Sequence, residues 1–184
     1  GRYVTTDYED GTQAVKEMRA MIAAFHDAGI AVNMDVVYNH TSGTGLGSLY
    51  DMTIPYYYYR LDSEGNYSNG SGCGNDVATT RAMARRLIVE STAYWVKEYK
   101  VDGFRFDLMG LIDTETMNQA YEACAAINPD TLFVGEGWKM YNGPAGTFGM
   151  EQKQVTKTDN IAVFNDELRD ACKKGGLSEG AGFI

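Results

Sequence analysis

The sequence contains little cysteine, histidine or proline, with three cysteines, two histidines and three prolines among 184 residues. Cys73, Cys124 and Cys172 are widely spaced, odd in number and without a CxxC pair, which argues against a disulfide framework and against a zinc site. His26 and His40 fit no transition-metal spacing. We interpret the cysteines as buried or incidental thiols and His26 as an ordinary surface residue.

Long apolar runs and a surplus of basic residues are also absent. No stretch of about 18 apolar residues occurs, which excludes a membrane span by length, and the first residues lack the basic and apolar regions of a signal peptide. The formal net charge of −9 disfavours binding to nucleic acid or to an anionic membrane surface. We expect neither as a partner, whereas a neutral polysaccharide would be indifferent to this charge.

The overall composition is that of a soluble globular protein, with 44% hydrophobic and 22% charged residues. Its aromatic residues lean towards tyrosine, with 13 Tyr against 7 Phe and 2 Trp. Tyrosine offers a flat apolar face and a polar tip, which suits sugar binding and equally suits any half-buried position. The aromatic content therefore decides nothing by itself.

Helical and strand-like segments alternate along the chain. Helices are predicted at about residues 10–28, 77–100, 113–127 and 166–174, and strands at 30–38, 101–107, 131–136 and 161–165. Strands separated by helices indicate parallel βαβ units, so the predicted fold class is α/β. A doubly wound sheet and a (β/α)₈ TIM barrel both fit this alternation. If the fold is a barrel, it is an incomplete one, since a whole barrel needs about 250 residues.

Apolar residues at three- and four-residue steps predict which helix faces are buried. We expect the buried faces to be Val15, Met18, Ile22 and Phe25 on the first helix, Met83, Leu87 and Trp95 on the second, and Met117, Tyr121 and Cys124 on the third. Gly29 is expected to end the first helix with a positive φ.

A long irregular region follows the first predicted strand. Residues 39–76 are rich in Gly, Ser, Asn and Tyr, and a loop of this length inside a compact domain is usually functional or a small subdomain. We treat residues 1–184 as one partial domain with a loop insertion at about 41–76. Its glycine segment 70–74 lacks the strand-to-helix placement of a dinucleotide fingerprint. We interpret it as a mobile loop, and a nucleotide-binding doubly wound domain is disfavoured.

Polar residues cluster where the predicted strands end, at the edge where parallel α/β folds build active sites. Alternation along the second strand puts Arg105 and Asp107 on one face and Phe104 and Phe106 on the other. An arginine beside a carboxylate keeps it ionised, as the nucleophile of glycoside cleavage must be. The alternative is a structural Arg–Asp pair. The clusters are Asp35 with Asn39 and His40, Arg105 with Asp107, Glu136 with Trp138, and Asn165 with Asp166.

Glu136 follows an apolar strand and lies between Gly135 and Gly137, and glycines let a ligand or another backbone approach closely. A carboxyl group beside an apolar surface, here that of Trp138, can keep a proton and donate it near neutral pH. The alternative is a strand-end glutamate in an ordinary loop. Carboxylates that end neighbouring strands, about 4.8 Å apart, fit the separation of about 5–5.5 Å that retaining glycosidases use.

Three segments carry a resemblance to a known family. DVVYNH at 35–40, GFRFDLMG at 103–110 and GEGW at 135–138 resemble, in order and spacing, three successive signature regions of the α-amylase superfamily. YYYYRLDSEGNYSNGSGCGND and VFNDELRDACKKG resemble its type I pullulanase branch, whose members cleave α-1,6 branches. The resemblance covers essentially the whole chain. It implies roughly strands three to six of a (β/α)₈ barrel, with their helices.

The resemblance also implies roles for individual residues. Asp107 would be the nucleophile and Glu136 the general acid/base, with Arg105 holding Asp107 ionised and oriented. His40 would contact the sugar, Asp35 would support the hydrogen-bond network, and Trp138 would offer a stacking face. Asn39 matches a position that ligates a structural calcium in many amylases. The chemistry would require no cofactor, and the only metal suggested is that calcium.

The departures from the family pattern matter as much as the matches. The family's third catalytic acid lies in an Asn-His-Asp motif, which is absent because the two histidines stand at 26 and 40. The segment with the second-strand stacking tyrosine is absent too. We therefore expect a fragment of a larger enzyme that lacks the remainder of its own barrel, exposes two strand edges and is inactive alone.

The implied function is retaining hydrolysis of α-1,6-glucosidic branch linkages in pullulan, starch or glycogen dextrins, with an α-glucan polysaccharide or branched oligosaccharide as partner. One alternative is an α-1,4-acting hydrolase or glucanotransferase of the same superfamily. Another is a non-catalytic α-glucan-binding fragment. The loop at 143–146 lies where specificity would be set but does not reveal the linkage. The bacterial cytoplasm and secretion both fit the sparse cysteines.

Overall fold

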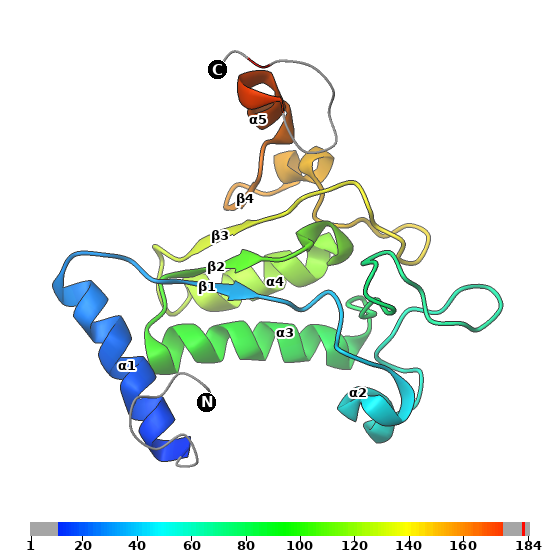
Figure 1. The fold of residues 1–184 in the computed structure, drawn as a ribbon, viewed down its shortest axis with the longest axis horizontal. Helices are drawn as coiled ribbons and strands as arrows, with labels where there is room; N and C mark the ends of the chain where they lie inside the picture. The colour runs from blue at the N-terminus through cyan, green and yellow to red at the C-terminus, as the bar shows by residue number, and fades with distance from the viewer. Residues whose placement is uncertain (1–10, 175–181, 183–184) are drawn as a thin grey trace.

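The computed structural model describes residues 11–174 and 182, and its centre is a parallel sheet of four strands. The strands are β1 (Asn33–Val36), β2 (Gly103–Phe106), β3 (Leu132–Gly135) and β4 (Ile161–Val163), arranged in that order. Every neighbouring pair is parallel, and all the carboxyl ends lie at one edge (Figure 1). The prediction of parallel βαβ units and of an α/β fold is confirmed.

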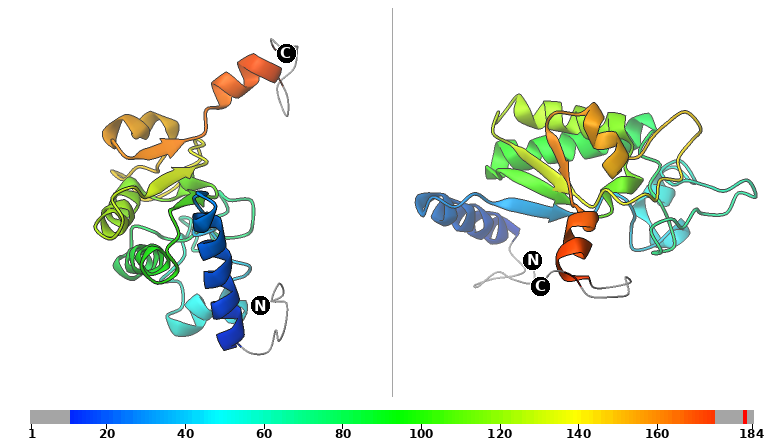
Figure 2. Two further views of the ribbon diagram at one scale, coloured as in Figure 1. Left: turned by 90° about the vertical axis from the view of Figure 1, so that its left-hand side faces the viewer. Right: turned by 90° about the horizontal axis from the view of Figure 1, so that it is seen from above.

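The helices lie between and around these strands. They are α1 (Gly11–Asp27), α2 (Leu49–Thr53), α3 (Ala82–Tyr94), α4 (Thr114–Ala125) and α5 (Asp166–Lys173), with 3₁₀ turns η1 (Gly45–Gly47), η3 (Met109–Leu111) and η4 (Gln152–Lys157) and the π segment η2 (Trp95–Tyr99). In Figure 2, α3 and α4 run side by side against one face of the sheet. Within residues 11–174, no helix has the length and apolar character needed to cross a membrane.

The core lies between the sheet and these two helices. Phe104 and Phe106 of β2 pack against Phe133 of β3, with ring centroids 5.5 and 4.9 Å apart. Ile88 of α3 and Met117 of α4 close the layer, and all five side chains are fully buried. Each such side chain contributes about 1.5–3 kcal/mol of hydrophobic free energy.

The opposite face of the sheet is open to solvent, unlike the buried face. Along each strand the alternate side chains point away from α3 and α4. Asp35 and Leu132 are exposed there, whereas Arg105 and Val134 are partly exposed. This open face therefore carries both charged and apolar side chains.

The second helix differs from its prediction in both start and register. It begins at Ala82 rather than near 77, because Val77 pairs with Tyr59 in an antiparallel bridge. Met83 and Leu87, predicted to be buried, are 44% and 42% exposed. Ala84, Ile88 and Thr92 face the core instead. Both sets have helical spacing, and packing against α4 and the sheet selected the second.

The first helix buries less than its pattern predicts, while the third agrees. Ile22 is buried, but Val15 and Phe25 are exposed. The predicted start at residue 10 lies outside the described residues. Gly29 has a φ of 72°, as expected for a helix end. In α4, Met117 and Cys124 are buried and Tyr121 packs edge-on against Phe133.

His26 lies on the surface, as predicted, and has a partner there. Its Nε2 lies 2.8 Å from Oδ2 of Asp102, just before β2. The same carboxylate oxygen accepts a 2.6 Å hydrogen bond from the backbone N–H of Val32. This contact joins the end of α1 to the beginning of the sheet.

Candidate active site

One guanidinium joins three carboxylates at the carboxyl edge of the sheet. Nη1 of Arg105 lies 2.9 Å from Oδ1 of Asp35 and 3.1 Å from Oδ1 of Asp107, and Nη2 lies 2.7 Å from Oε1 of Glu136. The register explains the meeting, because Asp35 stands opposite Arg105 across the β1–β2 pair. The hydrogen bond to Asp35, followed by the charge of Glu136, raises the pKa of Arg105.

Asp107 is held by further contacts behind this cluster. Nδ2 of the buried Asn39 lies 2.7 Å from the carbonyl oxygen of Asp107 and 3.2 Å from its Oδ2. The backbone N–H of Asp107 donates to the carbonyl oxygen of Val36 at 3.0 Å. The backbone and both carboxylate oxygens of Asp107 therefore have fixed partners, and the side chain remains partly open to solvent.

Glu136 is held by the turn that follows Asp107. The backbone N–H of Leu108 donates to Oε2 of Glu136 at 2.9 Å, and that of Gly110 donates to the Glu136 carbonyl oxygen, also at 2.9 Å. Leu108 has φ 40° and ψ 48°, in the left-handed region that a leucine rarely adopts. No local pattern predicts this role of Leu108, since the left-handed conformation belongs to a turn whose path depends on where β3 lies.

The backbone of Trp138, two residues after Glu136, packs against Gly110 in the turn after Asp107. A β-carbon on Gly110 would lie 2.0 Å from the Trp138 carbonyl oxygen, so the two backbones touch. The Trp138 indole is partly buried, and the Arg169 guanidinium of α5 lies 5.8 Å from the centre of its ring. Gly110 thus provides the close approach for which glycine is required.

His40 and Asn39 form a pair. Nδ1 of His40 lies 2.6 Å from Oδ1 of Asn39, so both ends of the Asn39 amide are occupied. No group of three or more His, Cys, Asp or Glu side chains that could hold a metal occurs in the described part of the chain. Calcium takes six to eight oxygen ligands. The amide oxygen of Asn39, which such a site would use, lies against His40, and a calcium ion at Asn39 stays a prediction from the resemblance.

The fourth predicted cluster does not join the site. Oδ1 of Asn165 accepts from the backbone N–H of Leu168 and caps α5, while Oδ1 of Asp166 accepts from Nε2 of Gln152 at 2.6 Å. Both residues therefore hold α5 and η4 in place. Phe164, just before them, does reach the cluster, with its ring centre 5.7 Å from the Arg105 guanidinium.

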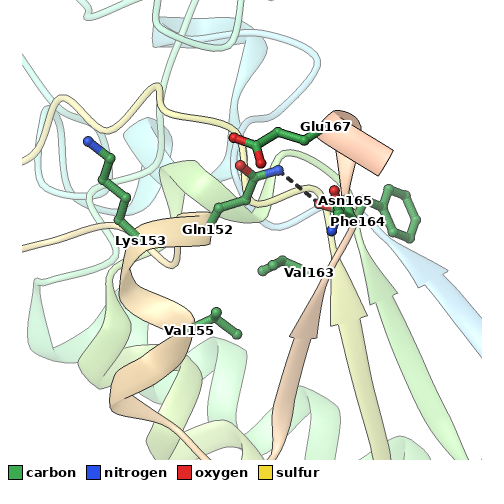
Figure 3. Close-up of a pocket in the computed structure, with 7 residues that line it drawn as sticks. All are labelled: Gln152, Lys153, Val155, Val163, Phe164, Asn165 and Glu167. Atoms are coloured by element: carbon green, nitrogen blue, oxygen red, sulfur yellow. Dashed lines mark hydrogen bonds between the residues drawn. The ribbon is translucent and has the colours of Figure 1, made fainter. Parts of the chain in front are cut away.

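A pocket of about 360 Å³ opens beside β4, and Phe164, which lines it, is also the residue whose ring faces Arg105 of the cluster. Its walls come from η4, from the end of β4 and from the start of α5 (Figure 3). Gln152 closes one side through a 3.0 Å hydrogen bond to the carbonyl oxygen of Phe164. It is lined by Gln152, Lys153, Val155, Val163, Phe164, Asn165 and Glu167. Asp107 and Glu136 do not line it, so it is a neighbouring feature and not the carboxylate site itself.

The sequence of this chain is similar to those of known pullulanases. The chain is 36% identical over 178 residues to Pullulanase A of Streptococcus pneumoniae and 38% identical over 177 residues to the pullulanase of Bacillus subtilis, matches that cover 96% and 94% of this chain. It is 41% identical over 125 residues to the isoamylase of Pseudomonas amyloderamosa. The chain belongs to the pullulanase family. No family model matches the sequence.

Solved pullulanase structures share the fold. The type I pullulanase of Bacillus subtilis in complex with maltose superposes with a TM-score of 0.86 at 38% identity, over 91% of this chain. The pullulanase of Anoxybacillus sp. LM18-11 in complex with maltotriose superposes with a TM-score of 0.91 at 40% identity, over 97%. This pullulanase-family chain spans only 14% and 24% of the length of the two pullulanase sequences above, and 24% and 26% of these two solved chains.

Proposed function

We propose that this chain supplies two catalytic carboxylates to a longer enzyme that hydrolyses α-1,6-glucosidic branch linkages with retention. The observation that carries the proposal is the bridging of Asp35, Asp107 and Glu136 by Arg105 at the carboxyl edge of the sheet. Retaining glycoside cleavage uses two carboxyl groups close together. Asp107 and Glu136 are close together in this sense, because one guanidinium contacts both carboxyl groups.

Asp107 acts as the nucleophile in this proposal. Its carboxylate attacks the anomeric carbon, and the glycosidic bond breaks as a covalent glycosyl intermediate forms. Arg105 lies 3.1 Å from one oxygen of the Asp107 carboxylate, and Asn39 orients Asp107 through the bonds to its backbone and its Oδ2. Because Arg105 lies in β2 and Asn39 follows β1 by three residues, the nucleophile is held at the ends of two neighbouring strands.

Glu136 acts as the acid and then as the base. It donates a proton to the leaving glycosidic oxygen, and in the second step it takes a proton from the water that releases the sugar from Asp107. The Leu108 N–H anchors one of its oxygens. The other oxygen, now bound to Arg105, is the one that an arriving glucan would contact. His40, Asp35 and Trp138 border the same edge and are the proposed sugar contacts.

The four strands correspond, in this proposal, to strands three to six of a (β/α)₈ barrel. The open face of the sheet, with Asp35, Arg105 and Val134, would then be the barrel interior. The outer edges of β1 and β4 would pair with strands from the rest of the longer polypeptide, which would also bring the third carboxylate. On this basis the 184-residue chain alone is inactive.

The substrate class is an α-glucan. Pullulanase structures that resemble this chain are complexes with maltose, maltotriose and maltotetraose. The sequence relatives are pullulanases and an isoamylase. These relatives favour pullulan and branched dextrins over linear starch as the substrate of the longer enzyme.

The experiment compares reducing-sugar release from pullulan and from linear amylose, using the longer polypeptide and the 184-residue chain. Cleavage of pullulan by the longer polypeptide only is the expected result. Cleavage of amylose alone would favour an α-1,4-acting relative, and turnover by the 184-residue chain would overturn the incomplete-site proposal. Asp107→Asn should abolish turnover while maltotriose binding persists. Unchanged turnover in that variant would exclude Asp107 as nucleophile.

A further inference from the structure

A single buried arginine joins three segments that lie far apart in the sequence. Arg60 belongs to the β1–α3 segment, residues 37–81, and is only 5% exposed. Its Nη2 donates to the Leu111 carbonyl oxygen of η3 at 2.5 Å, and its Nη1 donates to Oδ1 of Asn142 at 2.8 Å. Asn142 lies in the loop after β3, residues 136–151. Figure 1 shows these segments at the carboxyl ends of the strands.

A contribution to the stability of the fold does not by itself explain why an arginine is buried at position 60. Among residues 11–174, no carboxylate lies within ion-pair distance of its guanidinium. Burial lowers the pKa of Arg60, and a buried charge without an ion-pair partner is costly. Its guanidinium also contacts the Thr79 hydroxyl at 3.3 Å and the Tyr141 ring, whose centre is 4.7 Å away. The charges of Asp76 and Asp113 act on it from beyond ion-pair distance. Arg60 therefore acts as a cross-link between turns.

Asn142 reinforces this cross-link from the other side. Its Nδ2 donates to Oδ2 of Asp76 at 2.6 Å and to Oγ of Ser68 at 2.7 Å. Asp76 is fully buried and also accepts from the backbone N–H groups of Gly70 and Ser71. A β-carbon on Gly70 would lie 2.5 Å from Nδ2 of Asn142. The glycine segment thus encloses a carboxylate of the chain itself.

Both turns that Arg60 joins belong to the carboxylate site. The turn with Leu111 follows Asp107 directly, and its Leu108 N–H holds the Glu136 carboxylate. The loop with Asn142 begins at Glu136. We propose that Arg60 is a positioning residue which, through Asn142, fixes the turn after Asp107 relative to the loop after Glu136. This inference rests on the proposed function, since it acts through those two carboxylates.

The test uses the longer polypeptide with Arg60→Met, Arg60→Lys and Asn142→Ala, and measures kcat and KM on pullulan. Misplacement of reacting groups by about 1 Å costs on the order of 100-fold, so kcat should fall about 10- to 100-fold while KM changes little. A lysine cannot reproduce the two-armed contact of an arginine, so Arg60→Lys should restore only part of the kcat that Arg60→Met loses. Asn142 is exposed, so Asn142→Ala remains informative if Arg60→Met does not fold.

Arg81→Met is the matched control. Arg81 belongs to the same segment and donates to the backbone carbonyl oxygens of Tyr56 and Tyr57 at 2.9 and 2.5 Å. It has no hydrogen bond to either turn of the carboxylate site. Its loss should lower stability and leave kcat close to that of the wild type. Equal losses of kcat in Arg81→Met and in Arg60→Met would overturn the proposal, as would a wild-type kcat in Asn142→Ala.

A second readout does not depend on activity. In Asn142→Ala, amide hydrogen exchange should become about tenfold faster or more in peptides covering 108–112 and 138–150, and it should remain unchanged there in Arg81→Met. Unchanged exchange in Asn142→Ala would overturn the inferred cross-link. If the wild type cleaves no α-glucan but the exchange of the two turns still responds to Asn142, the proposed function fails while the coupling of the turns stands.

Discussion

The backbone N–H of Leu108 donates a 2.9 Å hydrogen bond to Oε2 of Glu136, which joins the residue after Asp107 to the carboxylate of the next strand. Leu108 adopts a left-handed conformation to make it, a conformation that costs on the order of 1–3 kcal/mol for such a residue. The strained turn therefore fixes the position of Glu136 relative to Asp107.

Arg105→Met should lower kcat/KM on α-glucan by at least about 100-fold in the longer polypeptide, because it removes the only cation bridging three carboxylates in the described residues. Arg105→Lys should recover little, since a single ammonium nitrogen cannot reproduce the fixed fork of the guanidinium, whose two nitrogens hold Asp107 and Glu136 separately. Steady-state kinetics provide the measurement. Arg86→Met is the control, because among residues 11–174 the Arg86 guanidinium pairs with exposed Glu90 on α3 alone, and its loss should leave activity unchanged.

Gly110→Ala should disrupt the turn between the two carboxylates. The new β-carbon would lie 2.0 Å from the Trp138 carbonyl oxygen. A backbone atom cannot move aside as the end of a flexible side chain can. We expect a loss of roughly 1–3 kcal/mol in the free energy of unfolding, measured by urea denaturation, together with a fall in kcat. Gly47→Ala is the control, as a β-carbon there meets nothing within 4 Å. Equal stability of the two variants would contradict this packing.

Asp113→Ala should destabilise the protein through the start of α4. Oδ1 of Asp113 accepts from the Thr116 N–H at 3.0 Å and from Nη2 of Arg85 at 3.1 Å, and the side chain is buried. Loss of a helix cap costs about 0.5–2 kcal/mol, and the unpaired buried groups add about 1–3 kcal/mol. Thermal or urea unfolding gives the difference. Asp130→Ala, at an exposed site, should change stability by less than about 0.5 kcal/mol.

Cys124 should resist alkylation until the protein unfolds. Burial raises the pKa of its thiol from an ordinary 9.0 to about 11, so little thiolate exists at pH 8. Exposed Cys73 should react quickly with iodoacetamide under the same conditions, as mass spectrometry would show. Because the folded pKa is raised, the stability contributed by the neutral thiol is complete below about pH 9 and is lost as pH rises towards 11. Fast labelling of native Cys124 would contradict its burial.

Local sequence pattern is enough to predict the alternation of strands and helices and the two faces of β2. Period-two alternation places Phe104 and Phe106 on one side and Arg105 and Asp107 on the other, and the structure has this arrangement. The prediction that polar strand ends meet holds for β1, β2 and β3, because parallel strands end at one edge of a sheet, and it fails for Asn165 and Asp166 after β4. These features follow from local geometry and from the topology of βα units.

Tertiary structure alone decided which helix face is buried and which loops touch. In α3, Met83 and Leu87 have the same spacing as Ala84 and Ile88, so periodicity leaves two faces open and packing chose the second. Arg60 reaches Leu111 and Asn142 across 51 and 82 positions of the chain. No local pattern encodes such contacts, because they depend on how the segments at the carboxyl edge pack together in space.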